Sequence, residues 1–363
     1  MNTIVDESTT ADSSAGGGGH RTTLHSVAQA AGVSLSTASK VVNGRTGVGL
    51  ETRHRVEAAI SRLGYVSLGE RQVGSLAASE AMIELLVDPR DVTNPYLSLL
   101  LGGAMESAER LSAGLVLRSI DVAMTRDPIP WAQSLARAGR SGVIEVTSTY
   151  SPRREKALRA VGLPMVLVDP IDVPRTSVAS IGATNWAGAY AATKHLLELG
   201  HRRIAYLGGP LGAGCDIIRA HGWAAAMSEA GIAVDSSAVL REAYTFEHGL
   251  RAGTELLKQR NRPTAIFAGS DISAMGVLEA ARQLGIAVPA QLSVVGFDDT
   301  VLAATSTPPL TTVHQPIADI GRLAVLTVLR LSRGENLSTK RVELATDLVV
   351  RDSTAPVPQG VRK

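Results

Sequence analysis

The stretch from Leu24 to Tyr65 constrains the fold more than any other part of the chain. Apolar residues recur there at helical spacing in three short segments, Leu24–Ala31, Leu35 to about Val42, and about Glu51 to Leu63. Gly32 ends the first segment at a point where a left-handed residue is favoured, and Ser34 is a good N-cap for the second. Two short helices joined by so tight a turn predict a helix–turn–helix, whose second helix enters the DNA major groove.

The outward side of the second helix carries side chains that suit DNA. Short polar side chains suited to phosphates are Ser34, Thr37, Ser39 and Asn43. The side chains expected to reach base edges are Leu35, Ser36 and Lys40. Between residues 21 and 79, seven Lys or Arg side chains oppose three Glu, a local net charge of +4. The whole chain carries only +2, so this local patch is what favours DNA binding over a plain helical bundle.

Length and composition set the remaining limits. A chain of 363 residues predicts two or three domains. Cys215 is the only cysteine, which excludes an intrachain disulfide and fits a reducing compartment. No N-terminal apolar run resembles a signal peptide, and no uncharged stretch reaches transmembrane length. We therefore expect a cytoplasmic protein that associates with the nucleoid when it binds DNA.

The rest of the chain is predicted to be α/β, so together with the N-terminal helices the expected fold class is α + α/β. Residues 1–20 lack a hydrophobic pattern and are predicted to form a disordered tail. After residue 80, short apolar strands alternate with helices, which predicts two lobes with doubly wound parallel sheets. We expect a DNA-binding domain at 21–66, a linker at 67–80 and a C-terminal tail at 351–363. Lobe one is expected at about 81–172 and 316–335. Lobe two is expected at about 173–315 and 336–350, with a strand around Arg341–Val350.

Catalytic motifs are not evident in the sequence. The run GGPLGAG follows a strand but has neither G-x-G-x-x-G nor the Lys-Ser/Thr of a P-loop. No HExxH motif or paired Cys/His set predicts a metal site. His201, between Gly200 and Arg202, is interpreted as a surface turn residue. The sequence therefore favours a non-enzymatic protein without a cofactor.

Several separated motifs resemble one known family. VAQAAGVSLSTASKVVNG followed by TRHRVEAAISRLGY resembles the N-terminal domain of the LacI/GalR family of bacterial transcriptional regulators. Later segments, including RAHGW, AIFAGSDISAMGVLEAARQLGI and LSVVGFDD followed by PPLTTVHQP, are similar to the effector domains of that family. The resemblance covers about residues 22–350. It implies a periplasmic-binding-protein-like fold, a homodimer on pseudo-palindromic operator DNA, and a small-molecule effector.

The linker departs from the family pattern. The resemblance implies a short hinge helix with a leucine that wedges into the minor groove, and Leu76 is the best candidate. Ser67-Leu68 replaces the usual Pro-Asn, and nearby glycines weaken helix formation, so a flexible linker is the alternative. Lys40 stands where the family usually has arginine, which predicts weaker base discrimination.

The effector is expected between the lobes. In open α/β sheets, ligands bind outside the carboxyl ends of the strands. Residues after expected strands are Asp88, Thr147, Asp169, Ser270, Asp271 and Asp298, and further lining candidates are Asn94, Tyr96 and Tyr244. By resemblance, Arg219 in RAHGW and Asp298 in GFDD match typical ligand contacts of the family, whereas Ser270 replaces the family's usual asparagine. The alternatives are that Asp298 caps a turn and that Arg219 merely begins a surface helix.

These features together predict a ligand-regulated repressor of carbohydrate-utilisation genes. Carboxylates, amides and an arginine fork suit a sugar, and the segment ATNWAGAYAATKHLLELGHRRIAYLGG resembles regulators associated with xylose or xyloside use. One alternative is an activator or a corepressor-dependent regulator. The other is a sugar-binding receptor whose DNA binding is impaired.

Overall fold

The computed structural model describes residues 24–42, 49–63, 81–172 and 178–357. The chain divides into two compact units, Met1–Ser79 and Glu80–Lys363, each with its own core. Among the helices that these ranges contain, none has the length and apolar character needed to span a bilayer.

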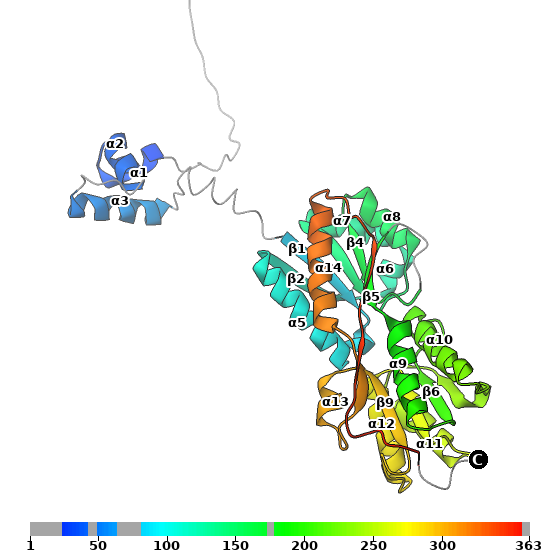
Figure 1. Ribbon diagram of the computed structural model, residues 1–363. Helices are drawn as coiled ribbons and strands as arrows, with labels where there is room; N and C mark the ends of the chain where they lie inside the picture. The colour runs from blue at the N-terminus through cyan, green and yellow to red at the C-terminus, as the bar shows by residue number, and fades with distance from the viewer. Residues whose placement is uncertain (1–23, 43–48, 64–80, 173–177, 358–363) are drawn as a thin grey trace, which may run out of the picture. The chain divides into compact units, whose positions relative to one another are not determined.

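The first unit contains the three predicted helices (Figure 1). They are α1 (Leu24–Ala31), α2 (Leu35–Val42) and α3 (Leu50–Leu63). Their common core consists of Val27, Ala31, Val41, Val56 and Ala59, with Val33 packed against it from the turn. Gly32 has a φ of +65°, which a glycine adopts without strain, so the tight turn is confirmed.

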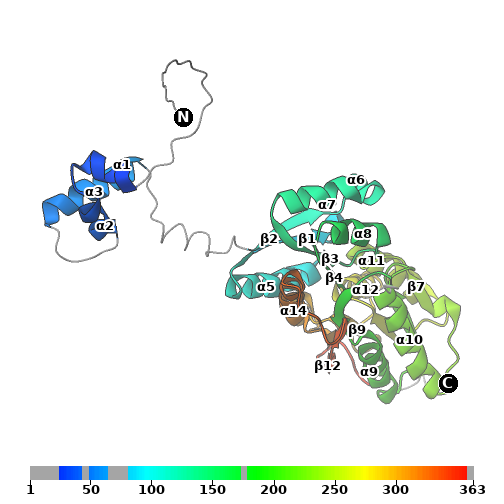
Figure 2. The same cartoon turned by 90° about the horizontal axis from the view of Figure 1, so that it is seen from above.

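The second unit begins with a six-stranded parallel sheet. Its strands are β1 (Ala81–Val87), β2 (Ala113–Ser119), β3 (Arg140–Val146), β4 (Met165–Val168), β5 (Ala179–Ala183) and β11 (Arg341–Leu344), in the order β11-β5-β4-β3-β1-β2. The helices of this lobe are α5 (Pro95–Arg110), α6 (Val122–Arg126), α7 (Pro128–Arg137), α8 (Pro152–Ala160) and α14 (Ile317–Ser332). Helices α5 and α14 cover one face of the sheet, and α6, α7 and α8 cover the other (Figure 2).

Small residues allow α5 and α14 to approach closely. A Cβ atom added at Gly103 would lie 1.9 Å from the backbone oxygen of Ala318, and one at Gly321 would lie 2.2 Å from that of Leu100. Both glycines therefore permit a backbone-to-backbone contact that larger residues would prevent. This packing ties α14, which arrives late in the chain, to the first lobe.

The second lobe has a six-stranded sheet of its own. Its strands are β6 (Ile204–Gly208), β7 (Val239–Arg241), β8 (Ala265–Ala268), β9 (Ser293–Asp298), β10 (Thr311–His314) and β12 (Asp347–Val349), in the order β12-β10-β9-β8-β6-β7. Only β12 is antiparallel to its neighbour among these strands. Helices α9 (Asn185–Glu198) and α10 (Gly214–Glu229) pack on one face, and α11 (Phe246–Lys258) and α12 (Asp271–Gln283) pack on the other. The short elements η1 (Pro89–Asp91), η2 (Ser236–Ala238) and α13 (Val301–Thr305) complete the unit.

The boundary between the lobes differs from the prediction in two places. Residues 173–315 were assigned to lobe two, yet β5 pairs with β4 in the first sheet, so the chain crosses after Ala183. The single strand expected around Arg341–Val350 is two strands, since β11 joins the first sheet and β12 the second. The break falls at Thr346, whose backbone N–H donates to the Thr184 hydroxyl at 3.0 Å instead of continuing a ladder. The described chain thus crosses between the lobes after Ala183, between His314 and Ile317, and between Leu344 and Asp347.

The C-terminal segment Arg351–Val357 is packed on the second lobe and is not a free tail. Ser353 is fully buried, and its hydroxyl donates to the Val294 carbonyl at 2.6 Å and accepts from the Thr311 N–H at 2.8 Å. The prediction of a tail was therefore wrong for residues 351–357, because the segment completes the hydrogen bonding of β9 and β10. The end of the predicted tail, residues 358–363, lies outside the described ranges.

The interpretation of His201 as a surface turn residue was also wrong. His201 is 1% exposed, its Nδ1 lies 2.9 Å from the Thr264 hydroxyl, and its Nε2 lies 3.0 Å from the carbonyl oxygen of Ala355. Burial lowers the pKa of this imidazole. The side chain is buried because the C-terminal segment, distant in sequence, covers the turn that contains it.

Candidate functional site

The candidate DNA-binding surface is the outer side of α2. Leu35 is 51% exposed and Lys40 is exposed as well, as expected of side chains that reach DNA. The Ser34 hydroxyl accepts the backbone N–H of Thr37 at 3.2 Å and bonds the Thr37 hydroxyl at 2.8 Å. Ser34 is therefore the N-cap of α2, and its position at a helix start suits a phosphate contact.

The other predicted DNA contacts are less well defined. Ser36 and Ser39 lie on α2, as predicted. Asn43 and Leu76 lie outside the described residues, as does the whole linker at 67–80. The roles assigned to these side chains remain predictions.

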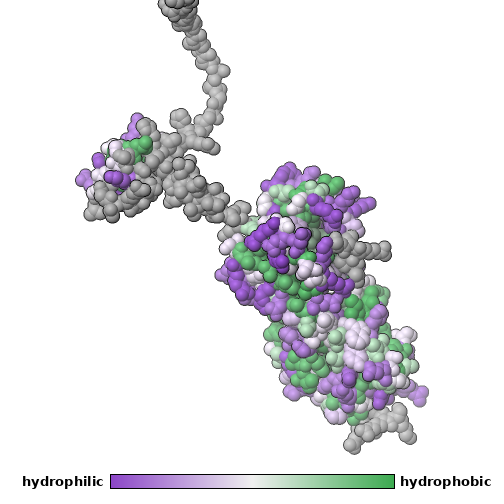
Figure 3. All heavy atoms as spheres, turned by 45° about the horizontal axis from the view of Figure 1, so that its top comes forward, coloured by the Kyte–Doolittle hydropathy of each residue, from purple (hydrophilic) through white to green (hydrophobic). Residues whose placement is uncertain are grey.

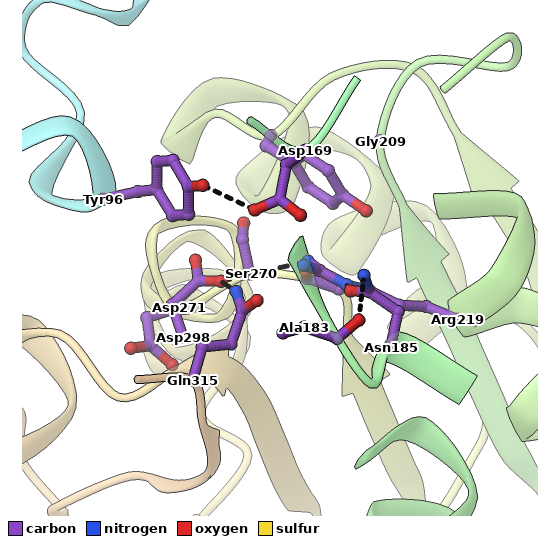
Figure 4. A network of polar contacts seen from close by, with 12 residues as sticks. Tyr96, Asp169, Ala183, Asn185, Gly209, Arg219, Ser270, Asp271, Asp298 and Gln315 are labelled. Carbon is purple, nitrogen blue, oxygen red and sulfur yellow. Dashed lines mark hydrogen bonds and ion pairs between the residues drawn. The ribbon is translucent and has the colours of Figure 1, made fainter. Parts of the chain in front are cut away.

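The candidate effector cleft lies at the carboxyl ends of the two sheets. Its side chains are Tyr96, Asp169, Asn185, Arg219, Asp298 and Gln315 (Figure 4), together with Tyr244, whose ring lies beside Arg219. Tyr96 and Asp169 come from the first lobe, and Arg219, Tyr244 and Asp298 come from the second. The cleft therefore contains five of the ten predicted effector residues, drawn from both lobes.

Three predicted residues at strand ends have unusual backbones. Thr147 follows β3, Asp169 follows β4 and Asp298 ends β9, and their φ angles are 46°, 41° and 116°. Non-glycine residues rarely adopt positive φ, and such strain gathers at functional sites. This observation independently marks the strand ends that the sequence selected.

Tyr96 and Asp169 form the first-lobe wall of the cleft. Tyr96 lies in the first turn of α5, and its hydroxyl donates to Asp169 Oδ2 at 2.5 Å. Asp169 is 7% exposed, and burial raises the pKa of its carboxyl despite this hydrogen bond. Burial also raises the pKa of the Tyr96 hydroxyl, so Tyr96 is a neutral donor at physiological pH.

Arg219 is the central cation of the second-lobe wall. It lies in the interior of α10, is 4% exposed, and donates from Nε to Asn185 Oδ1 at 2.7 Å and from Nη1 to the Gly269 carbonyl at 2.5 Å. Its guanidinium carbon lies 3.8 Å from the centre of the Phe297 ring, a cation–π contact. These contacts exclude the alternative that Arg219 is a surface residue at a helix start.

Asp298 faces Arg219 and is linked to a crossing segment. Asp298 Oδ1 lies 3.9 Å from Arg219 Nη1 and accepts from Gln315 Nε2 at 2.6 Å. Burial is the largest effect on the pKa of Asp298 and raises it. Attraction to Arg219, the next largest effect, lowers it. Asp298 is thus a buried ligand candidate and not only a turn cap.

Asp271 and Tyr244 have structural partners already. Both Asp271 oxygens are used, because Oδ2 accepts from the Thr300 N–H at 2.7 Å and Oδ1 accepts from the Thr312 hydroxyl at 2.6 Å. The Tyr244 hydroxyl donates to Asp216 Oδ1 at 2.9 Å, which holds the ring 5.5 Å from the Arg219 guanidinium. Asp271 therefore supports the cleft from beneath, whereas Tyr244 forms part of its wall.

The remaining predicted residues act mainly as caps or lie at the rim. Asn94 and Ser270 are the N-caps of α5 and α12. Asp88 accepts from Arg90 at 2.7 Å, and the Thr147 hydroxyl donates to Asp91 at 2.9 Å. Each of these side chains already has a hydrogen-bond partner close by in the sequence or fold. The part of these residues in effector binding therefore remains a prediction.

Sequence reasoning missed three side chains of the site. Asn185 and Gln315 stand in the ATNW and HQP segments, which were noted for their resemblance but not as ligand residues. Phe297, directly before Asp298, was read only as part of a strand. The signal available for Gln315 was its place beside a proline where the chain leaves the second lobe. Within the described ranges no group of three His, Cys, Asp or Glu residues suits a metal ion.

Two family models match the chain. The model described as bacterial regulatory proteins, lacI family, matches residues 23–67, and the model of the periplasmic binding protein-like domain matches residues 193–354. The HTH-type transcriptional regulator DegA of Bacillus subtilis is 33% identical over 340 residues, which cover 93% of this chain and 99% of DegA. Both units therefore match in one continuous alignment.

Solved structures agree with the sequence relatives. The transcriptional regulator CelR in complex with cellobiose is 30% identical, with a TM-score of 0.69, over 92% of this chain and 100% of that one. The lac repressor dimer bound to operator and the anti-inducer ONPF is 28% identical, with a TM-score of 0.70, over 92% of this chain and 99% of that one. These relatives are regulators and not enzymes. The chain belongs to the LacI family and is a DNA-binding transcriptional regulator with a periplasmic-binding-protein-like effector domain.

Proposed function

We propose that this protein is a repressor whose operator affinity is controlled by a small sugar bound in the effector cleft. The observation that carries the proposal is the buried set of Asp169, Arg219 and Asp298, drawn from both lobes around one centre. Sugar hydroxyls both donate and accept, so they suit carboxylates beside an arginine fork. Phe297 and Tyr244 add aromatic surface next to these groups.

A ligand between the lobes favours one closure state over another. Asp169 belongs to the first lobe and Asp298 to the second, so a ligand that bonds both is held fully only when the lobes are close. Such differential affinity is the source of any shift between conformations.

Gln315 provides a route from the cleft to the first lobe. It lies on the crossing between β10 and α14, is 2% exposed, and bonds Asp298 directly. A ligand that moves Asp298 therefore acts on the segment that leads into α14. Because α14 packs against α5, the first lobe responds as a whole.

The proposal includes a homodimer on a pseudo-palindromic operator. Exposed large apolar side chains occur on three adjacent elements of the first lobe, at Leu99 and Met105 on α5, Leu117 on β2 and Leu326 on α14. Hydrophobic side chains also reach the surface of both lobes between hydrophilic ones (Figure 3). A two-fold dimer would pair two α2 helices with two half-sites about one helical turn or a multiple apart.

Operator binding by the purified protein tests the function. DNA from the protein's own promoter region is titrated at fixed salt, with and without pentoses, hexoses, cellobiose, xylose and xylosides. We expect one sugar to release the DNA, and Arg219→Ala to abolish that release while operator affinity stays within about twofold. Asp347→Asn, at an exposed position on β12, is the matched control that should behave as the wild type.

Other outcomes separate the alternatives. A sugar that strengthens operator binding would indicate a corepressor-dependent regulator. If the protein binds a sugar but binds no promoter DNA specifically, it is a receptor-like protein whose DNA-binding domain is impaired. A normal response from Arg219→Ala would show that the effector binds elsewhere.

A further inference from the structure

We infer that the effector is an uncharged, hydroxyl-rich molecule and that the cleft excludes phosphorylated and carboxylated sugars. This inference rests on the proposed function and narrows its class of effector. It follows from the kinds of polar atom that line the cleft and from the balance of charge around them.

Two carboxyl groups and an amide oxygen supply hydrogen-bond acceptors in the lining. Asp169 and Asp298 are carboxylates, which only accept when ionised. The Gln315 amide lies beside Asp298 (Figure 4), and its Oε1 is buried without a hydrogen-bond partner among the described residues. A sugar hydroxyl can donate to these oxygens, whereas a phosphate or carboxylate group is itself an acceptor and meets no complementary atom there.

The cleft offers little positive charge. Among the described residues that line it, Arg219 is the one with a cationic side chain, and Nε and Nη1 already donate to Asn185 and Gly269. Arg219 faces Asp298 at 3.9 Å and is also attracted to Asp169, so its guanidinium is already engaged by carboxyl groups. An anionic ligand would have to compete with these carboxylates for a single guanidinium.

Charges at the rim do not reverse this balance. Arg90 is paired with Asp88 by hydrogen bonds of 3.0 and 2.7 Å. Asp91 lies in the same short helix, is bonded to Thr147, and has its pKa raised mainly by burial. The segment from Asp88 to Asp91 therefore adds a carboxyl group and no unpaired cation.

Helix N-termini at the cleft are already capped. Such termini attract anions through their free N–H groups and their dipoles. The Asn94 side chain accepts the Tyr96 N–H at 3.0 Å on α5, and Ser270 accepts the Ser273 N–H at 3.3 Å on α12. Asp216 and Asp271 lie in the first turns of α10 and α12 and oppose their dipoles. These helix starts therefore offer less attraction to an anion than bare ones would.

Burial of the carboxyl groups also disfavours a further negative charge in the cleft. Burial raises the pKa of Asp169, Asp271 and Asp298, and repulsion from Asp271 raises that of Asp298 further. A site that resists ionisation of its own carboxyls resists the entry of another anion for the same reason. One extra like charge about 7 Å from an unbalanced carboxylate corresponds to roughly 50-fold weaker binding at an effective dielectric of about 20.

Matched ligand pairs test the inference on the wild-type protein. Glucose is compared with glucose 6-phosphate and glucuronate, galactose with galactose 6-phosphate and galacturonate, and ribose with ribose 5-phosphate. Binding is measured by calorimetry without DNA, because added salt weakens DNA binding by itself. Ionic strength is held constant with sodium chloride, and inorganic phosphate serves as the anion control.

We expect at least one neutral sugar to bind and its charged derivatives to bind roughly 50-fold more weakly or not at all. A phosphorylated or carboxylated sugar that binds as tightly as its parent, or alone, would overturn this inference and leave the sugar-effector proposal standing. Binding of no sugar in either form would overturn the sugar-effector proposal, and this inference with it.

Discussion

Replacing Asp298 by asparagine should stabilise the ligand-free protein at neutral pH and weaken its response to the effector. Asp298 is 6% exposed, and burial raises the pKa of its carboxyl from 3.8 to about 8. A carboxyl whose folded pKa is raised contributes stability below its unfolded pKa and loses that contribution as the pH rises through the folded value. The free energy of unfolding of the wild type therefore falls as the pH rises between these two pKa values, and the neutral amide of asparagine avoids that loss.

The size of the gain follows from the same shift. One pKa unit corresponds to about 1.4 kcal/mol, and the shift of Asp298 already includes the opposing attraction to Arg219 and the hydrogen bond from Gln315. An asparagine oxygen can still accept from Gln315 Nε2, which now bonds the carboxylate at 2.6 Å. Because structural relaxation reduces such effects, we expect a gain of roughly 1–3 kcal/mol near pH 7.5.

Urea unfolding followed by tryptophan fluorescence measures this difference near pH 5 and near pH 7.5. The advantage of Asp298→Asn over the wild type should be small at the lower pH and should grow at the higher one. The variant should also need at least about tenfold more effector for half-release of operator, since a hydrogen bond between the effector and the Asp298 carboxyl is lost. Asp347→Asn should match the wild type in both assays. A variant less stable than the wild type near pH 7.5, or a difference independent of pH, would refute the reasoning.

Three further predictions concern the DNA-binding domain, the C-terminal segment and the N-terminus. Lys40→Ala should weaken specific operator binding by roughly tenfold and affect non-specific DNA less, since a base contact is lost; unchanged operator preference in a competition assay would remove Lys40 from the reading face. Ser353→Ala should lower the free energy of unfolding by about 1–3 kcal/mol, because the buried Thr311 N–H loses its acceptor; urea unfolding should show no change if this bond is unimportant. Removal of residues 1–20 should leave operator affinity and effector response unchanged in the promoter assay, and lost repression would show that the segment has a role.

The parts of the fold that local sequence determines could be predicted. The three helices of the DNA-binding domain follow from the spacing of apolar residues, from Gly32, which ends the first helix, and from Ser34, which caps the second. Each of these signals acts within a few residues. The alternation of strands and helices likewise predicts two doubly wound lobes. The boundary between the lobes could not be predicted, because β5 and β11 are short strands at one side of the first sheet and β11 pairs there with β5, which is far away in sequence.

The cleft was predictable to a similar extent. Asp169 and Asp298 follow from the rule that ligands bind at carboxyl ends of strands, and Arg219 followed from the resemblance of its motif. Asn94 and Ser270 were selected by the same positional rule, yet they are helix caps. Sequence position cannot distinguish a side chain that turns toward a ligand from one that turns back to its own helix.

The crossing segments connect the candidate cleft to both lobes of the effector domain. Thr184 and Thr346 lie on two different crossings, and their hydroxyls are 2.9 Å apart, so these segments are tied together. The third crossing carries Gln315, which is bonded to Asp298. The candidate ligand site therefore shares a hydrogen bond with the crossing that leads into α14, and we propose this bond as the route of coupling. We therefore expect a ligand that displaces Asp298 to act on the connection between the lobes, and α14 and α5 to move together because they pack closely at Gly103 and Gly321.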